Sequence, residues 1–325
     1  MRRFLSLLLA LLLTLSLAGC GEAETHDPDK LQIVATLFPY YDLARTIAGD
    51  KAEITLLCAA GRESHSYEPT PRDILRVTEA DLFLYNGGVD ETWATELLQT
   101  TAHGAVFTGM DCVEALEEGE IESATSHEHD HGHEHDDDHE HDDEHDHEIE
   151  YDEHIWTSPK NVMRLADGLF SLLIELDRAN AAYYGENYTA FIAELQSLDR
   201  DFTALAEEAG HPTLLFGDRF PFLYFCEEYG FGYEAAFLGC STETEPSAAT
   251  MRALIEYAKA QNGGYVYYLE NSSARVAEAV AEASGAEPAL LCSCQSITGE
   301  DFQNGETYLT LMRRNYETLT KGVAR

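Results

Sequence analysis

The sequence predicts an α/β protein of two βα-sandwich lobes with mostly parallel sheets, joined by one long rigid helix. Up to about residue 180, short apolar runs alternate with longer amphipathic stretches, as is typical of βα units around a parallel sheet. One uninterrupted helical pattern covers 181–209, and the alternation then restarts after Gly210. With 325 residues, of which 44% are hydrophobic, the chain is long enough to form two such cores.

The first lobe is expected over 31–180. Thr70-Pro71 and Ser158-Pro159 each place a capping hydroxyl before a proline, which is a common opening of a helix. Asn86-Gly87-Gly88 marks a turn at the end of the third strand. The expected strands are 32–37, 53–57, 81–85 and 105–108, and the expected helices are 40–49, 70–78, 90–101 and 158–177.

A linking helix is expected over 181–210, and the second lobe over 211–325. The apolar residues of this helix recur at steps of three or four, which fits either core packing or a rigid connector between lobes. The second lobe is expected to hold strands 213–216, 233–237, 265–269 and 289–291, and helices 220–229, 246–261, 273–284 and 307–323. Because ligands of open parallel sheets bind beyond the carboxyl ends of the strands, functional side chains are expected in the loops that follow strands.

Residues 1–19 have the pattern of an export signal. Arg2 and Arg3 precede an almost unbroken apolar run over 4–17, and Leu17-Ala18-Gly19-Cys20 has the form of a bacterial lipobox. Cleavage before Cys20 leaves a cysteine that carries lipid, and 20–30 is then a polar tether. The alternative, a helix that spans the membrane, needs a longer apolar run. We therefore expect a lipid-anchored protein on the extracytoplasmic side of the cell membrane.

The acidic charge is concentrated in one segment. The chain has 60 acidic and 20 basic residues and a formal net charge of −40, which argues against nucleic acid as a partner because phosphate binding needs clustered Lys and Arg. Residues 120–153 contain 17 of the acids, nine His and no Lys or Arg. We expect a disordered loop over 120–150, because 127–147 has no apolar residue that could offset the cost of ordering it.

This loop is either a solvated charge run or a set of weak metal sites. Many imidazoles among carboxylates offer several shifting ligand sets, which favours the second interpretation. The auxiliary metal-binding residues would be His127, His129, His131, His133, His135, His139, His141, His145 and His147.

Two further histidines lie beside predicted helices. His65 lies in the loop after the second strand, and His154 lies just before the helix that opens at Ser158. Neutral imidazole is the commonest metal ligand in proteins, although a loop His taken singly more often bonds to the backbone. Their position on either side of the His-rich loop favours metal binding.

The residues 64–69 (Ser-His-Ser-Tyr-Glu-Pro), 154–159 (His-Ile-Trp-Thr-Ser-Pro) and 244–247 (Thr-Glu-Pro-Ser) resemble those of the zinc- and manganese-binding lipoproteins that serve ABC importers. The lipobox, the His-rich insertion and the closing segment 308–315 are similar as well. The resemblance covers nearly the whole mature chain. It implies two lobes with a divalent metal between them, and delivery of that metal to an ABC permease in the membrane. We expect a monomer.

The resemblance also implies a ligand set. That family takes one His from each of two loops of the first lobe, which correspond to His65 and His154. A third ligand, His or Glu, comes from the first strand-loop of the second lobe, where this chain has Asp218, which could instead cap a helix or pair with Arg219. A fourth, typically Asp, follows the last strand, where Cys292 stands by register. This set favours Zn²⁺ over Mn²⁺, which prefers harder oxygen donors.

The cysteines other than Cys20 bear on this assignment. We expect one disulfide, between Cys240 and Cys294, with buried free thiols as the alternative for Cys58 and Cys226. A disulfide at Cys292 would instead leave three protein ligands and a water at the metal.

Functions besides zinc delivery are also compatible with these residues. An exported zinc-dependent hydrolase likewise holds zinc with three protein ligands and a water. No predicted helix carries a His-Glu-x-x-His segment and the chain has no nucleophile motif, so we expect it not to be an enzyme. A manganese-binding protein, or a surface protein that buffers metal without transport, would use a similar set of residues.

Overall fold

The computed structural model describes residues 27–62, 64, 67–118, 151–239, 245–261 and 264–323. The expected export signal, the expected lipid-attachment residue Cys20, the His-rich loop and His65 lie outside the described residues, and so does Cys240. In the part of the chain that is described, no helix is both long and apolar enough to cross a bilayer.

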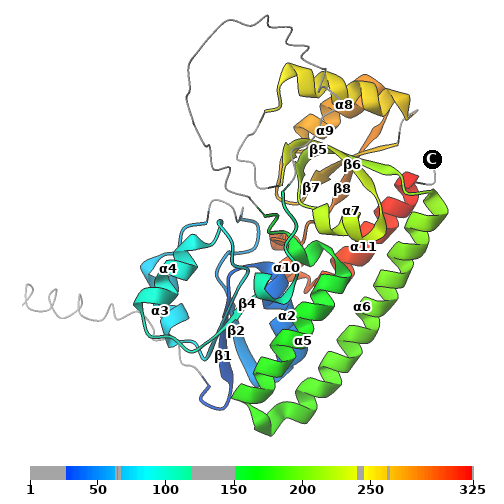
Figure 1. Ribbon diagram of the computed structural model, residues 1–325. Coiled ribbons are helices and arrows are strands. Elements are labelled where there is room, and N and C mark those ends of the chain that lie inside the picture. Colours follow the sequence, from blue (N-terminus) through cyan, green and yellow to red (C-terminus); the bar gives the residue numbers. More distant parts are fainter. Residues whose placement is uncertain are drawn as a thin grey trace, which may run out of the picture.

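The first lobe contains a parallel sheet with the strand order β2-β1-β3-β4. Helices α3 and α4 cover one face of this sheet, and α2 and α5 cover the other (Figure 1). The strands are β1 (Leu31–Ala35), β2 (Ala52–Leu56), β3 (Leu82–Tyr85) and β4 (Ala105–Thr108), and the helices are α2 (Phe38–Ala48), α3 (Pro71–Glu79), α4 (Thr92–Thr100) and α5 (Pro159–Leu176).

Strand β3 explains why this sheet is covered on both faces. Its four residues are all buried. Leu82 and Leu84 belong to the apolar cluster beneath α2 and α5, whereas Phe83 and Tyr85 belong to the cluster beneath α3 and α4. A strand that is buried on both faces is a continuous apolar run in the sequence, which is the pattern typical of parallel sheets.

The predicted helix openings are confirmed. The Thr70 hydroxyl accepts a hydrogen bond from the Asp73 N–H, and the Asp73 carboxylate accepts one from the Thr70 N–H, so α3 begins with a reciprocal capping box. The Ser158 hydroxyl likewise accepts from the Asn161 N–H at the start of α5. The second of these caps follows the short 3-10 turn Ile155–Thr157, which begins directly after His154.

The second lobe repeats the architecture with the strand order β6-β5-β7-β8, again entirely parallel. Strand β5 is longer than expected, because the chain bulges after Phe216 and then resumes pairing at Arg219. The short helix α10 was not predicted. The strands are β5 (Thr213–Phe220), β6 (Gly232–Leu238), β7 (Tyr265–Leu269) and β8 (Glu287–Leu291), and the helices are α7 (Leu223–Tyr229), α8 (Ala248–Ala260), α9 (Arg275–Ser284), α10 (Gly299–Gln303) and α11 (Tyr308–Val323).

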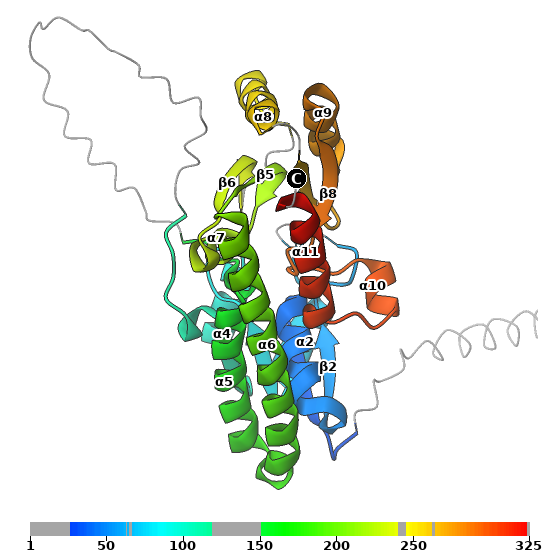
Figure 2. The same ribbon diagram turned by 90° about the vertical axis from the view of Figure 1, so that its right-hand side faces the viewer.

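Helix α6 (Ala181–Ala209) runs alongside both lobes, flanked by α5 and α11 (Figures 1 and 2). Its bounds are those predicted from the apolar stripe. The stripe is buried in a cluster that extends from Ile33 in the first sheet to Leu291 in the second. The helix therefore both packs into the core and connects the lobes.

The two sheets place their ligand-binding edges in equivalent positions. In each sheet the second strand in sequence pairs on one side of the first, and the third strand pairs on the other side. The direction of the strand order therefore reverses between β1 and β3 in the first lobe and between β5 and β7 in the second. Ligands of open α/β sheets bind beyond the carboxyl ends of strands at such a switch point. The segments after these four strands are therefore the structural candidates for the functional site.

Two glycines of α6 should respond oppositely to alanine. Gly185 lies inside the helix, where an added Cβ would lie 3.7 Å from Phe170, an ordinary contact. Gly185→Ala should therefore raise the free energy of unfolding by about 0.5–1 kcal/mol, because glycine loses more backbone entropy on folding. Gly210 caps the helix at φ 73°, so Gly210→Ala should lower the same quantity by about 1 kcal/mol. Urea unfolding measures the change in the free energy of unfolding for each variant. The prediction would be wrong if both variants were stabilised or both were destabilised.

Candidate metal centre

His154 is buried where the first lobe meets the second, with 1% of its surface exposed. The Asp152 carboxylate accepts a hydrogen bond from the backbone N–H of His154 (2.8 Å). The same carboxylate oxygen lies 3.3 Å from Nδ1 of the His154 imidazole. Burial alone would lower the pKa of His154, but the carboxylates of Asp152, Asp90 and Glu153 outweigh it, and the pKa is raised. A carboxylate at one ring nitrogen fixes the orientation of an imidazole that binds metal through the other.

The turn that follows His154 ties the first lobe to the second. The Trp156 indole N–H donates to the backbone carbonyl of Ser293 (2.9 Å), which follows β8. The Trp156 ring also meets the His154 ring edge to face, with 5.7 Å between centroids. The Tyr308 hydroxyl at the start of α11 donates to the Trp156 carbonyl (2.9 Å). His154 therefore lies on a segment that three buried contacts hold in place.

The loop after β3 supports the same segment from the first lobe. The Asn86 side-chain amide donates to the Glu153 carbonyl (2.9 Å), and Asn86 accepts in turn from the Tyr40 hydroxyl. The Glu153 carboxylate accepts from the backbone N–H groups of Val89 and Asp90. Burial raises the pKa of Glu153 to about 7. The residue before His154 is thus fixed through both its backbone and its side chain.

Asp218 lies in the bulge of β5, and its carboxylate is engaged within the second lobe. It accepts hydrogen bonds from the Leu269 N–H (3.0 Å), from the Ser272 hydroxyl and from the Arg219 N–H (2.8 Å). These contacts join the end of β5 to the loop after β7.

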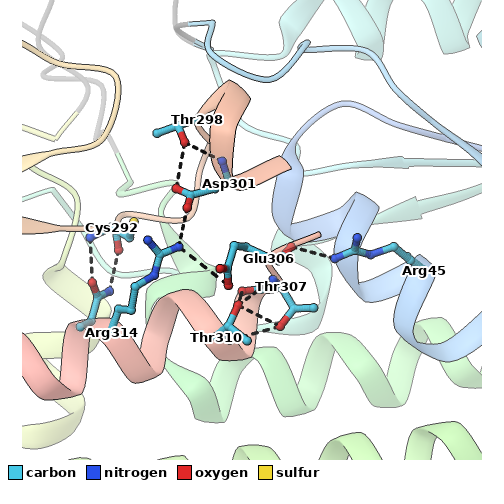
Figure 3. A network of polar contacts seen from close by, with 9 residues as sticks. Arg45, Cys292, Thr298, Asp301, Glu306, Thr307, Thr310 and Arg314 are labelled. Atoms are coloured by element: carbon cyan, nitrogen blue, oxygen red, sulfur yellow. Dashed lines mark hydrogen bonds and ion pairs between the residues drawn. The ribbon is translucent and has the colours of Figure 1, made fainter. Parts of the chain in front are cut away.

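Cys292 follows β8 on the side that faces α11. Asn315 of α11 accepts from the Cys292 N–H (2.8 Å) and donates to its carbonyl (2.7 Å). Figure 3 places Cys292 beside Arg314, whose guanidinium pairs with Asp301 and Glu306. Cys292 lines a cavity of about 250 Å³ between β8 and α11, and burial raises the pKa of its thiol well above the usual range. This cavity is separate from the one that His154 lines.

The predicted disulfide between Cys240 and Cys294 is wrong. Cys294 is a free thiol and is fully buried in the apolar cluster that spans both lobes. Its Sγ lies 3.9 Å from the Cys292 carbonyl. The described cysteines, which are Cys58, Cys112, Cys226, Cys292 and Cys294, are all free.

A small cavity lies between the lobes beside His154. The loops after the strands of the second lobe supply most of its lining, as the strand order leads one to expect. The described residues that line it do not include Asp218 or Cys292. They are His154, Arg219, Pro221, Gly239, Leu269, Glu270, Ser272, Gln295 and Ser296.

Glu270 and Gln295 are polar side chains of this cavity that the sequence motifs did not indicate. Glu270 directly follows the predicted strand 265–269, so the rule that ligands bind beyond strand ends pointed to its position. Within the described residues, no three His, Cys, Asp or Glu side chains converge as a metal site. His65 lies outside those residues, so the predicted ligand set of His65, His154, Asp218 and Cys292 stays a prediction.

Comparisons with known proteins agree with the fold and with the family that the sequence motifs resemble. The chain is 32% identical over 317 residues to the zinc-binding lipoprotein AdcA of Streptococcus pneumoniae strain R6, covering 97% of this chain and 60% of that protein. It is 33% identical over 315 residues to the high-affinity zinc uptake system protein ZnuA of Bacillus subtilis strain 168, covering 94% and 93%. The chain thus spans about three fifths of the length of the AdcA relatives.

Solved structures give the same fold. The Zn(II)-bound ZnuA-like domain of Streptococcus pneumoniae AdcA matches 91% of this chain and 100% of that domain, at 27% identity and a TM-score of 0.72. The metal-dependent lipoprotein YcdH of Bacillus subtilis matches 90% and 99%, at 27% identity and a TM-score of 0.72. Residues 33–322 also match the family described as "Zinc-uptake complex component A periplasmic". The chain belongs to this family, ZnuA, which confirms the resemblance seen in the sequence motifs.

Proposed function

We propose that this protein captures a divalent metal, zinc in preference to manganese, outside the membrane and delivers it to an ABC importer. The observation that carries the proposal is a buried, carboxylate-oriented His154 at the junction of the lobes, in a chain of the zinc-uptake component family. Relatives named for zinc binding and zinc uptake support the choice of metal. The role is transport, and we infer no enzymatic activity.

The surroundings of the site suit a zinc cargo. We propose His65 and His154 as the imidazole ligands. The sequence offers Asp218 and Cys292 as further candidates from the second lobe, although neither is among the described residues that line the cavity beside His154. Zinc accepts His, carboxylate and thiolate ligands in a tetrahedral set, whereas manganese prefers oxygen donors. Because a metal binds neutral imidazole, uptake of zinc by His154 releases any proton held there.

The other parts of the chain fit this role. We propose that lipid on Cys20 anchors the protein at the outer surface of the membrane, as a monomer that meets its permease there. The His-rich loop would gather zinc in several weak sites near the crevice. The tight site would then be filled from a locally raised concentration of metal.

A zinc titration tests the proposal. Metal-free protein without its lipid should bind one tight zinc per chain in competition with a chelator, and bind manganese more weakly. Replacing His65 and His154 together by Ala should abolish tight zinc binding, because loss of a group that only orients a ligand already costs about 10–100-fold and here two ligands are removed. Deletion of 127–147 should leave the tight site intact.

His103→Ala is the matched control. His103 is exposed, and its ring bonds to the backbone carbonyl of the neighbouring Gly104, so its loss should not change zinc affinity. Tight binding that survives the double replacement would overturn the site, and equal affinity for manganese would overturn the metal preference.

A further inference from the structure

The cavity beside His154 lies at the switch point of the second sheet. Arg219 reaches it from β5 and Glu270 from the end of β7, the two strands between which the order reverses. Its volume is about 20 Å³, which is room for about one water molecule or one small ion. The cavity is thus of a size suited to a metal ion rather than to an organic solute.

We propose that Glu270 is the carboxylate through which the second lobe holds the metal bound by His154. This inference rests on the proposed function and assigns a residue after β7, whereas the family resemblance implied one residue in the bulge of β5 and one after β8. Among the described residues that line the cavity, Glu270 has the only carboxylate and His154 the only imidazole. An imidazole nitrogen and a carboxylate oxygen are both ligands that zinc accepts.

The Glu270 carboxylate is held in one orientation. It is 8% exposed, and its two oxygens accept from the Ser293 N–H (2.7 Å) and the Ser293 hydroxyl (2.6 Å). An ionised carboxylate has about four acceptor positions, so bonds from Ser293 are compatible with metal binding by the same group. Metal-binding carboxylates in proteins are commonly oriented by such hydrogen bonds.

The same serine couples Glu270 to His154. Ser293 accepts the Trp156 indole N–H at its carbonyl while its N–H and hydroxyl donate to Glu270. Trp156 lies two residues beyond His154 and contacts its ring. The two proposed ligands, from different lobes, are therefore connected through one serine and one tryptophan.

Charge also favours this assignment. Arg219 lines the cavity, and a divalent cation placed near a guanidinium in a buried site is disfavoured unless a negative charge lies close by. Glu270 supplies that charge from within the cavity. Asp218 and Cys292, in contrast, are not among the described residues that line it.

The test compares zinc affinities of the full chain and of Glu270→Gln, Asp218→Asn and Glu282→Gln. Glutamine keeps the length of Glu270 but removes its charge, so zinc affinity should fall at least about tenfold. Glu282 is an exposed carboxylate of α9, and its replacement should not change affinity. Glu270→Asp keeps the charge one methylene shorter and should lose less, which covers the case in which Glu270→Gln does not fold.

A second readout separates ligation from a general effect of charge. The visible absorption of bound Co²⁺ depends on its ligands, and it should change in Glu270→Gln but not in Asp218→Asn. Wild-type zinc affinity together with an unchanged Co²⁺ spectrum in Glu270→Gln would overturn the inference. The proposed function would survive that result if the His65 and His154 replacements still abolish tight binding. Absence of tight zinc binding by the wild-type chain would instead overturn the proposed function.

Discussion

Replacing Gly217 by Ala should destabilise the protein by about 3 kcal/mol, the upper part of the range for overpacking a well-packed site. Gly217 lies in the bulge of β5, directly against α9. A Cβ added there would lie 2.5 Å from the Ala277 Cα and 2.6 Å from the Ala277 backbone nitrogen. Real Cβ atoms do not approach other atoms so closely, so either the bulge or the whole helix has to move.

Relaxation is difficult because the atoms that clash belong to the helix backbone. Ala277 is fully buried and packs in the apolar cluster between α9 and the sheet. The bulge also carries Asp218, which is bonded to the Leu269 N–H, so moving β5 would break contacts with the loop after β7. A glycine within a strand often marks such a close backbone approach.

Two further variants make the measurement of unfolding in urea decisive. Gly299→Ala, at a position where an added Cβ meets nothing within 4 Å, should change stability by less than about 0.5 kcal/mol. Ala277→Gly removes the neighbouring methyl but not the backbone atoms, so adding it to Gly217→Ala should not restore stability. Full rescue by Ala277→Gly would mean that the backbone contact is not the cause.

The fold could largely be predicted because local patterns and tertiary packing agree in most elements. The apolar stripe of α6 predicted its two ends, and the Ser158-Pro159 pair predicted the start of α5. Strand β5 was predicted too short because Gly217 and Asp218 have the composition of a turn. In the structure they form a bulge, and the strand continues because α9 and the neighbouring strands β6 and β7 hold it.

The site was harder to predict because it depends on which way single side chains point. Cys292 and Ser293 are adjacent, but Cys292 faces the cavity beside α11, whereas Ser293 bonds to Glu270. Successive side chains of an extended chain point to opposite sides, so an error of one residue in register exchanges the two faces. Glu270 was missed because the cavity that it lines together with His154 is formed by contacts between the lobes, which no local pattern records.

Stability should fall as the pH rises from about 5 to 8, and Glu91→Gln should remove much of this dependence. Glu91 is buried at the start of α4, where its carboxylate accepts from the N–H groups of Asn86 (2.6 Å) and Gly87 (3.2 Å). Burial raises the pKa of Glu91 from 4.5 to about 7, and the nearby Asp90 carboxylate adds to this increase. Glu153 and Tyr40 are the other titratable groups close to it.

The sign follows from the number of protons bound in each state. Between pH 4.5 and 7 the folded protein keeps a proton on Glu91 that the unfolded chain has lost, so the free energy of unfolding decreases as the pH rises through this window. Each pKa unit is worth about 1.4 kcal/mol, so the full effect is about 3 kcal/mol. Glutamine resembles the protonated acid in shape and never ionises. The free energy of unfolding of the variant, relative to that of the wild type, should therefore rise by most of this amount from pH 5 to pH 8.

Urea unfolding of metal-free protein at several pH values measures the difference directly. Glu96→Gln removes an exposed carboxylate from the same helix and should keep the wild-type pH dependence. Glu153 titrates in the wild type and in both variants, and because the Glu91 carboxylate helps to raise the pKa of Glu153, Glu91→Gln should also lower the Glu153 pKa and change the pH dependence in the same direction. If the Glu91→Gln and wild-type curves stay parallel across this range, Glu91 is ionised in the folded state already at pH 5, and its hydrogen bonds from Asn86 and Gly87 outweigh the cost of burying the charge.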